Sequence, residues 1–257
     1  YNSMELFDKA IKDIRVYMQG KSDEGRVCEI QHTSINAGWP SGGGRNIVLS
    51  EDVGVELGNP REESVSFVVW TESPKEVKDG IISLIGPDLQ ISKGKSLPFG
   101  KVVIAGGKGF NEENSYDRYR EMESIRYDVD LKGYMLRAVS QYQREWSRVS
   151  KEALREGFSL NVLGGALIDK FKENDYIDAV EVIFVTSSRE DVKELKDIAK
   201  GVGRVVGAMN KMIEETSFDC KTCEYKDVCS EFTDLRKIRK VALRNLKLDI
   251  KIRGKNG

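Results

Sequence analysis

The spacing of the cysteines constrains this chain more than any other feature of its sequence. Three of the four cysteines lie close together, at Cys220, Cys223 and Cys229, in a stretch rich in Lys, Glu and Asp. Two cysteines with two residues between them can turn both sulfurs toward one point, and a third that follows a turn later can reach the same point. This donor set suits a cubane iron–sulfur cluster, or a tetrahedral zinc ion if a fourth ligand comes from elsewhere. Free thiols are usually scattered and buried, so the spacing favours a metal site over the alternative of four reduced cysteines.

The remaining cysteine, Cys28, stands almost the whole chain length away from this motif. It belongs to the alternating segment Val27-Cys-Glu-Ile-Gln, a pattern that is typical of a strand or an extended arm. We expect Cys28 to supply the fourth ligand. The metal would then tie the N-terminal segment to the C-terminal one, because the binding energy of a structural metal is also folding energy.

The charged residues are almost balanced, since 41 Lys and Arg against 42 Asp and Glu give a formal net charge of −1. This balance gives no indication of a nucleic acid or a membrane as partner. No apolar run approaches the ~20 residues that a membrane helix needs, and the charged amphipathic opening is unlike a signal peptide. We therefore expect a cytoplasmic protein, in which thiols stay reduced and clustered cysteines indicate metal binding rather than disulfides.

Hydrophobic periodicity predicts three parts. Residues 1–45 are expected to form an N-terminal helix and an arm with Cys28, which a glycine-rich loop at 38–45 separates from the body at 46–216. Residues 217–257 hold the cysteine motif and a basic helical tail. Within the body, β-branched runs predict strands and a long amphipathic run predicts a helix. The strands are expected at 47–49, 53–57, 64–70, 81–88, 97–105 and 179–186, and the helix at 187–215. The expected fold class is α+β, a mixed β-sheet with packed helices plus a small cysteine-rich metal-binding segment at the C-terminal end.

An arginine-rich stretch follows the first group of strands. Between residues 115 and 157 apolar and aromatic residues recur at threes and fours, which predicts a helical segment. The arginines interleaved with them are Arg118, Arg120, Arg126, Arg137, Arg144, Arg148 and Arg155. Arginines next to aromatics such as Trp146 can hold phosphates and stack on a purine. The alternative is a solvated helix face balanced by carboxylates such as Glu145, and the spacing alone favours that alternative.

Several short motifs occur in the order and spacing of a known family. They are Ile85-Gly-Pro-Asp-Leu, Leu97-Pro-Phe-Gly, Trp146-Ser-Arg-Val-Ser-Lys151, Gly157-Phe-Ser-Leu and the run that ends Phe184-Val-Thr. With these motifs, residues 45–230 resemble the beta subunit of CO dehydrogenase/acetyl-CoA synthase, which has an α+β fold. In that family the same succession leads to a CxxC and a third cysteine, which begin the iron–sulfur half of a nickel-containing cluster.

The resemblance implies a ligand and a metabolic setting. Trp146, Arg148 and Lys151, with Arg144 beside them, fall where the family places an arginine-rich surface linked to coenzyme A. A [4Fe–4S] cluster is the implied cofactor, with zinc as the alternative. The implied partner is a corrinoid protein, a methyltransferase or a CO dehydrogenase-type enzyme of anaerobic one-carbon metabolism.

The departures from the family pattern limit the expected function. Cys229 comes earlier than the third cysteine of the family, no cysteine follows it, and the Cys-Gly-Cys that holds nickel has no counterpart. We therefore expect an accessory or standalone iron–sulfur homologue, not a complete synthase. Two alternatives stay open, an enzyme that uses an open iron of a [4Fe–4S] cluster and a zinc-stabilised protein-interaction module. A distant N-terminal cysteine with a C-terminal C-x2-C-x5-C also resembles the iron staple of certain recombination and CRISPR-associated nucleases, whose acidic catalytic constellation is not convincingly present here.

Overall fold

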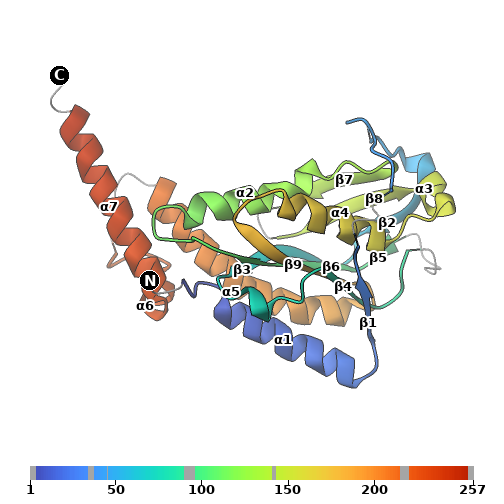
Figure 1. Cartoon of the computed structure of the whole chain (residues 1–257), viewed down its shortest axis with the longest axis horizontal. Coiled ribbons are helices and arrows are strands. Elements are labelled where there is room, and N and C mark those ends of the chain that lie inside the picture. Colours follow the sequence, from blue (N-terminus) through green and yellow to red (C-terminus); the bar gives the residue numbers. More distant parts are fainter. Residues whose placement is uncertain are drawn as a thin grey trace.

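The computed structural model describes residues 4–33, 38–44, 46–89, 96–140, 143–214 and 220–253. They form an α+β arrangement of two sheets with helices packed on them (Figure 1). The helices are α1 (Asp8–Asp23), α2 (Ser115–Asp128), α3 (Lys151–Glu156), α4 (Leu160–Lys172), α5 (Arg189–Glu214), α6 (Lys226–Glu231) and α7 (Thr233–Arg253). The strands are β1 (Val27–Gln31), β2 (Val53–Leu57), β3 (Ser64–Thr71), β4 (Ile81–Ile85), β5 (Ser96–Leu97), β6 (Phe99–Gly107), β7 (Tyr134–Val139), β8 (Glu145–Ser150) and β9 (Ile177–Val185).

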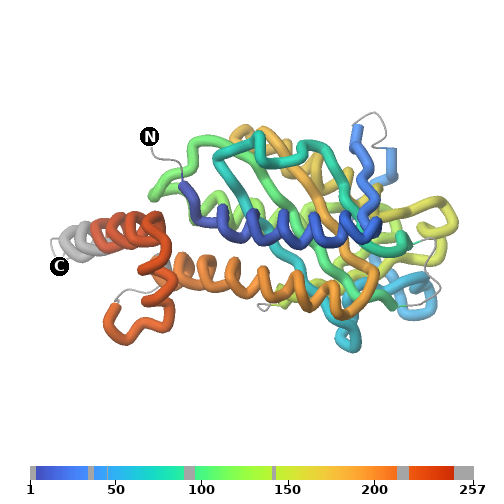
Figure 2. Tube along the Cα trace, turned by 90° about the horizontal axis from the view of Figure 1, so that it is seen from below, coloured from blue at the N-terminus to red at the C-terminus, as the bar shows by residue number. Residues whose placement is uncertain are grey.

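The larger sheet is mixed, as the sequence predicts, and its strand order is β1-β4-β9-β6-β3. The pairs β3–β6 and β4–β9 are parallel, whereas β1–β4 and β6–β9 are antiparallel. Strands β3 and β6 are buried along their whole length, and β9 is buried except at Asp178. Helices α1 and α5 lie on one face of this sheet and α2 and α4 on the other (Figures 1 and 2). Strands covered on both faces read as continuous apolar runs, which is why the sequence identified them.

The smaller sheet has the order β5-β2-β8-β7 and corrects one expectation. The helical pattern predicted for 115–157 holds for α2 and α3, but residues 134–139 and 145–150 form the antiparallel pair β7–β8. Buried Glu145, Ser147 and Val149 alternate with the half-buried side chains of Trp146 and Arg148. This period of two belongs to a strand with one covered face, and the helical spacing in β7 and β8 is coincidental.

A buried ion pair joins the two sheets. The Nζ atom of Lys101 on β6 lies 2.6 Å from a carboxylate oxygen of Glu145 at the start of β8, and both side chains are almost fully buried. The guanidinium of Arg126 on α2 lies 3.8 Å from the second oxygen. Burial opposes ionisation of Glu145, but Lys101 and Arg126 outweigh it and hold the pKa of this carboxyl below its ordinary value. The smaller sheet is therefore fixed to the larger one by charge as well as by apolar packing.

The N-terminal segment shares the core of the body. Strand β1 pairs with β4 at the edge of the larger sheet, and the apolar face of α1 packs on α5 and β3. The glycine-rich loop is also anchored, since the Nε1–H of Trp39 donates to the carbonyl of Lys132 at 3.0 Å and its ring packs edge-on against Phe158.

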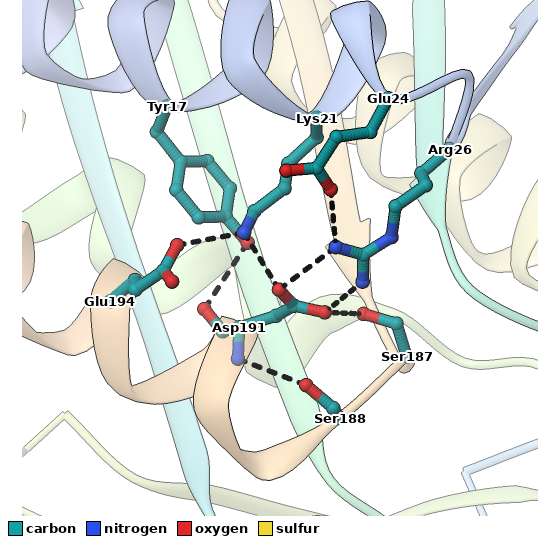
Figure 3. A network of polar contacts seen from close by, with 8 residues as sticks. All are labelled: Tyr17, Lys21, Glu24, Arg26, Ser187, Ser188, Asp191 and Glu194. Carbon is teal, nitrogen blue, oxygen red and sulfur yellow. Dashed lines mark hydrogen bonds and ion pairs between the residues drawn. The ribbon is translucent and has the colours of Figure 1, made fainter.

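A polar network fixes the turn between α1 and β1 to the beginning of α5 (Figure 3). Lys21 lies 2.7 Å from one oxygen of buried Asp191, and Arg26 and Ser187 donate to the other. Burial opposes ionisation of Asp191, but these hydrogen bonds outweigh it and lower the pKa of the carboxyl well below its ordinary value. The network therefore holds an ionised carboxylate between two cations.

The C-terminal helices lie at the opposite end of the molecule from β1 (Figures 1 and 2). Helix α5 leads to this end, and α7, whose Leu235 and Ile238 are buried, packs on it before it extends away from the body. The start of the chain meets these helices, because the N–H of Glu5 donates to Asp234 at 2.6 Å and Lys9 pairs with Glu231 at 2.9 Å. Within the described residues no helix has the length and apolarity that crossing a membrane requires.

Candidate functional site

The three C-terminal cysteines line one pocket, of about 210 Å³, between α5, α6 and α7. Cys229 on α6 is buried, and Cys220 and Cys223 in the preceding turns are half-buried. The other side chains that line the pocket are Ala208, Lys211 and Met212 of α5, Tyr225, Lys226 and Ser230, and Arg236 and Arg239 of α7. The spacing in the sequence therefore predicted a real gathering of thiols.

Local hydrogen bonds shape the cysteine turns. The N–H of Tyr225 donates to the sulfur of Cys223 at 3.4 Å, and the N–H of Cys229 donates to the carbonyl of Tyr225 at 2.9 Å. Tyr225 lies against α5 at Gly207, where a Cβ atom would come within 2.6 Å of the phenol oxygen. The missing Cβ of this glycine leaves room for the phenol ring. The turn that carries the CxxC is thus held against α5 by a tyrosine.

The pocket has a marked positive charge. Lys211, Lys226, Arg236 and Arg239 line it, and none of its described lining residues is an Asp or a Glu. The guanidinium of Arg239 donates to the sulfur of Cys220 at 3.4 Å. Burial and the neighbouring thiols raise the pKa of Cys229, although Arg239 opposes this effect. Without a metal this thiol stays protonated at neutral pH, and a bound metal would favour its thiolate form.

The donor types, three thiols, are those that zinc and iron–sulfur centres use. The ligands of a zinc ion lie about 2.0–2.3 Å from one centre, and within the described part of the chain no group of three or more His, Cys, Asp or Glu is arranged to hold a single metal ion. The thiolates of a cubane instead bind separate irons around a bulky core. Three thiols on the wall of an open cavity with nearby cations have the chemistry that an anionic cluster needs.

The structure does not bring Cys28 to the other three cysteines. Cys28 is exposed on β1, opposite Leu84 of β4. It follows the end of α1 that is remote from α6, and the 16 residues of α1 span about 24 Å at 1.5 Å per residue. The sequence predicted that a metal ties the N-terminal segment to the C-terminal one. In the structure Glu5 and Lys9 make this contact, with Asp234 and Glu231. A fourth ligand from Cys28 of the same molecule has no support in this arrangement.

The predicted arginine-rich surface is centred on Trp146. Two guanidinium groups lie over its indole, with the Cζ atoms of Arg137 and Arg148 at 5.5 and 5.4 Å from the ring centroid. Trp146 and Arg148 share one face of β8 because they are two residues apart on a strand. Arg148 pairs with Glu56 of β2 at 2.8 Å, and not with a neighbour on a helix as the sequence suggested. The indole Nε1 is buried and has no hydrogen-bond partner among the described residues.

The other two predicted residues lie apart from this centre. Arg144 donates to the carbonyls of Glu62 and Asn59, at 2.7 and 3.3 Å, and so holds the loop before β3. Lys151 is exposed, donates to the carbonyl of Glu51 and lines a neighbouring polar pocket of about 630 Å³. Arg148 reaches the edge of that pocket through a 3.4 Å contact with the carbonyl of Val48.

Sequence reasoning missed the cations of the cysteine pocket and the partners of Trp146. Arg236 and Arg239 were recognised as parts of a basic tail, and their spacing of three on a helix places them on one side of it. No local signal indicates that this side meets the cysteines. Glu56 was beyond prediction, because it lies 92 residues from Arg148 in the chain.

Residues 42–192 match the sequence model of the family described as CO dehydrogenase/acetyl-CoA synthase complex beta subunit. The chain belongs to this family. The match covers β2 to β9 and the Trp146 surface, whereas the C-terminal cysteines lie beyond its last residue. The resemblance seen in the short motifs is therefore confirmed for the body of the fold.

Individual members of the family are similar in sequence to a large part of this chain. The chain is 31% identical over 181 residues to the carbon monoxide dehydrogenase/acetyl-CoA synthase subunit alpha of Moorella thermoacetica. The aligned region covers 67% of this chain and 24% of that protein. It is 32% identical over 158 residues to the acetyl-CoA decarbonylase/synthase complex subunit beta of Methanopyrus kandleri, with 60% and 32% covered. For subunit beta 2 of that complex from Methanosarcina thermophila the identity is 27% over 184 residues, with 69% and 38% covered. The chain thus spans well under half of the length of these relatives.

Proposed function

We propose that this protein is an iron–sulfur-binding homologue of the synthase beta subunit that binds one [4Fe–4S] cluster through Cys220, Cys223 and Cys229. The observation that carries the proposal is the gathering of three thiols around a cation-lined pocket in a chain of this family. The protein would act as an accessory member of this family. The relatives are named as subunits of an acetyl-CoA decarbonylase/synthase complex.

A bound cluster would supply electron transfer or a Lewis-acidic iron. The three thiolates would hold it, and their approach to the pocket is set by the turn that Tyr225 fixes on α5. Arg239 would donate to the sulfur of Cys220, and such hydrogen bonds tune the reduction potential of a cluster. The cations around the cavity would offset the negative charge of the thiolates.

The proposal also includes a protein partner and a place in the cell. We infer a partner protein, which the family suggests is a corrinoid protein, a methyltransferase or a CO dehydrogenase-type enzyme in the cytoplasm of an anaerobe. The names of the relatives as subunits of a complex support a protein partner. The sequence gives no reason to expect a nucleic acid or a membrane as partner, because the charges of the chain are almost balanced.

Coenzyme A is the proposed small ligand of the Trp146 surface. An indole face can stack on adenine, and guanidinium groups bind phosphate oxygens in pairs. Arg137 and Arg148 already lie over the indole, so the surface has both elements within one sheet face. Arg144 and Lys151 contribute less directly, because the first holds a loop and the second lines the adjoining pocket.

Anaerobic purification tests the cluster. We expect a brown protein with iron and acid-labile sulfide in equal amounts and the broad visible absorption of an iron–sulfur cluster. Serine at Cys220, Cys223 or Cys229 should abolish this absorption. A colourless protein with stoichiometric zinc would instead support a zinc-stabilised interaction module and would refute the cluster.

A further inference from the structure

The single histidine of the chain lies beside a cavity that neither the cluster nor coenzyme A accounts for. This cavity, of about 490 Å³, is lined by His32 after β1, by Trp39 of the glycine-rich loop and by one face of α4. On α4 the lining residues Asn161, Gly165 and Asp169 are spaced by four, so they share that face. The cavity has no residue in common with the cysteine pocket or with the Trp146 surface.

A contact at this face of α4 holds His32 in place. The ring Nε2 lies 2.9 Å from one carboxylate oxygen of Asp169, and the histidine side chain is only 9% exposed. The ring packs closely on α4 at Gly165, where a Cβ atom would come within 2.7 Å of it. His32 thus occupies one oxygen of Asp169. The other oxygen of this carboxylate has no hydrogen-bond partner among the described residues, and it belongs to a side chain that is 37% exposed.

A second open acceptor lines the same face. The amide oxygen Oδ1 of Asn161 is buried and has no hydrogen-bond partner within the described part of the chain. A buried acceptor without a donor costs free energy, so a ligand that supplies the donor gains from it. The other charged groups of the described wall already have partners: Lys170 pairs with Glu173 at 2.9 Å, and Asp130 accepts hydrogen bonds from the glycine-rich loop. The open acceptors therefore belong to Asn161 and Asp169.

Two open acceptors favour a ligand with a hydrogen-bond donor at each end. Ammonium groups donate up to three hydrogen bonds and accept none. Asn161 and Asp169 are eight residues apart on α4, which is about 12 Å at 1.5 Å per residue. With each nitrogen about 3 Å from its acceptor, about 6 Å remain between two ammonium groups, and an extended chain of four methylene groups spans this distance. Val162 and Ala166 line the cavity between these positions and can contact such a chain.

We propose that this cavity binds a short aliphatic diamine, with one ammonium group on the carboxylate of Asp169 and the other on the amide oxygen of Asn161. The indole of Trp39 in the same wall adds the attraction of an aromatic face for a cation. A monoamine satisfies only one of the two acceptors, so the cavity distinguishes the two kinds of amine. The proposal goes beyond the proposed function and requires neither a bound cluster nor coenzyme A.

Calorimetry of the full chain with 1,4-diaminobutane and with butylamine tests this site. We expect saturable binding of the diamine at one site per chain and about tenfold weaker binding of butylamine, a difference of roughly 1.4 kcal/mol. Asp169→Asn removes the charge of the carboxylate and should weaken diamine binding by about tenfold or more. The matched control is Asp178→Asn, because Asp178 has a similar exposure and pairs with Lys108 away from the cavity. This control should bind the diamine like the unchanged protein.

A second variant tests the other end of the ligand. Asn161→Leu keeps the size of the side chain and removes its acceptor, so this variant should bind the diamine and butylamine with the same affinity. It also carries the test if thermal unfolding shows that Asp169→Asn does not fold. Three results overturn the proposal: equal affinity of the unchanged protein for the two amines, equal diamine affinity in Asp169→Asn and the control, or no heat of binding with millimolar diamine.

Discussion

The cysteine pocket and the Trp146 surface are both rich in arginine, yet they use it differently. On the smaller sheet the guanidinium groups are already engaged, Arg148 by Glu56 and Arg144 by two backbone carbonyls. At the cysteine pocket Arg236 and Arg239 have only a hydroxyl and a thiol as their described partners. Arginines satisfied within the protein stabilise the fold and bind a ligand only by exchange, whereas Arg236 and Arg239 place positive charge beside the thiols.

Among the substitutions in these two regions, removal of a thiol from the cysteine pocket should have the largest effect on metal content and local stability. We expect Cys223→Ser to lose the cluster entirely and to loosen α6 and α7, because a metal site contributes its binding energy to folding. Iron analysis and hydrogen exchange of the C-terminal helices measure both effects. Cys28→Ser is the matched control and should keep its iron, since Cys28 lies at the far end of α1. Loss of iron in that control would restore Cys28 as a ligand.

The Trp146 surface should depend instead on the buried pair beneath it. Glu145→Gln leaves Lys101 buried without its ion partner, and we expect a loss of about 3–5 kcal/mol in the free energy of unfolding. Urea denaturation measures this loss. Glu152→Gln, which removes an exposed partner of Lys132 next to the same strand, should change stability little. Equal effects in the two variants would mean that the buried pair does not hold the sheets together.

The network around Asp191 should make stability depend on acid. Because the pKa of Asp191 is lowered in the folded state, its contribution is complete above the unfolded pKa of about 3.9. The contribution is lost as the pH falls through the lower folded value. Asp191→Asn should cost about 3 kcal/mol at neutral pH and should flatten the decline of stability below pH 4. If the stability of the variant declines below pH 4 as steeply as that of the unchanged protein, other carboxyls, Glu145 among them, cause the decline.

The smallest expected effect concerns coenzyme A. Arg148→Ala should weaken binding by about 1.5–3 kcal/mol if the guanidinium exchanges Glu56 for a phosphate. Tryptophan fluorescence follows the titration, and Trp146→Phe identifies the reporter among the three tryptophans of the chain. If neither fluorescence nor calorimetry responds to millimolar coenzyme A, Arg148 has only a structural role and the Trp146 surface is not a coenzyme A site.

The sequence by itself determined the central strands, the long helix and the cysteine cluster of this protein. Strands β3, β6 and β9 are covered on both faces, so their apolar runs could be recognised without any knowledge of their partners. The amphipathic pattern of α5 and the bunching of Cys220, Cys223 and Cys229 are equally local. The family resemblance was also readable, because its motifs are short, collinear and largely within the body.

Only the tertiary structure decided how distant parts meet. Tyr134 to Ser150 has spacings that suit a helix as well as a strand, and the choice was made by pairing with β2 and by the burial of one face. The place of Cys28 depends on the direction and length of α1, which a cysteine count does not contain. Arg236 and Arg239 line the thiol pocket only because α7 packs on α5 and α6, a contact that no local pattern in α7 indicates. Periodicity fixes which side of an element is apolar, but only the path of the chain fixes what that side meets.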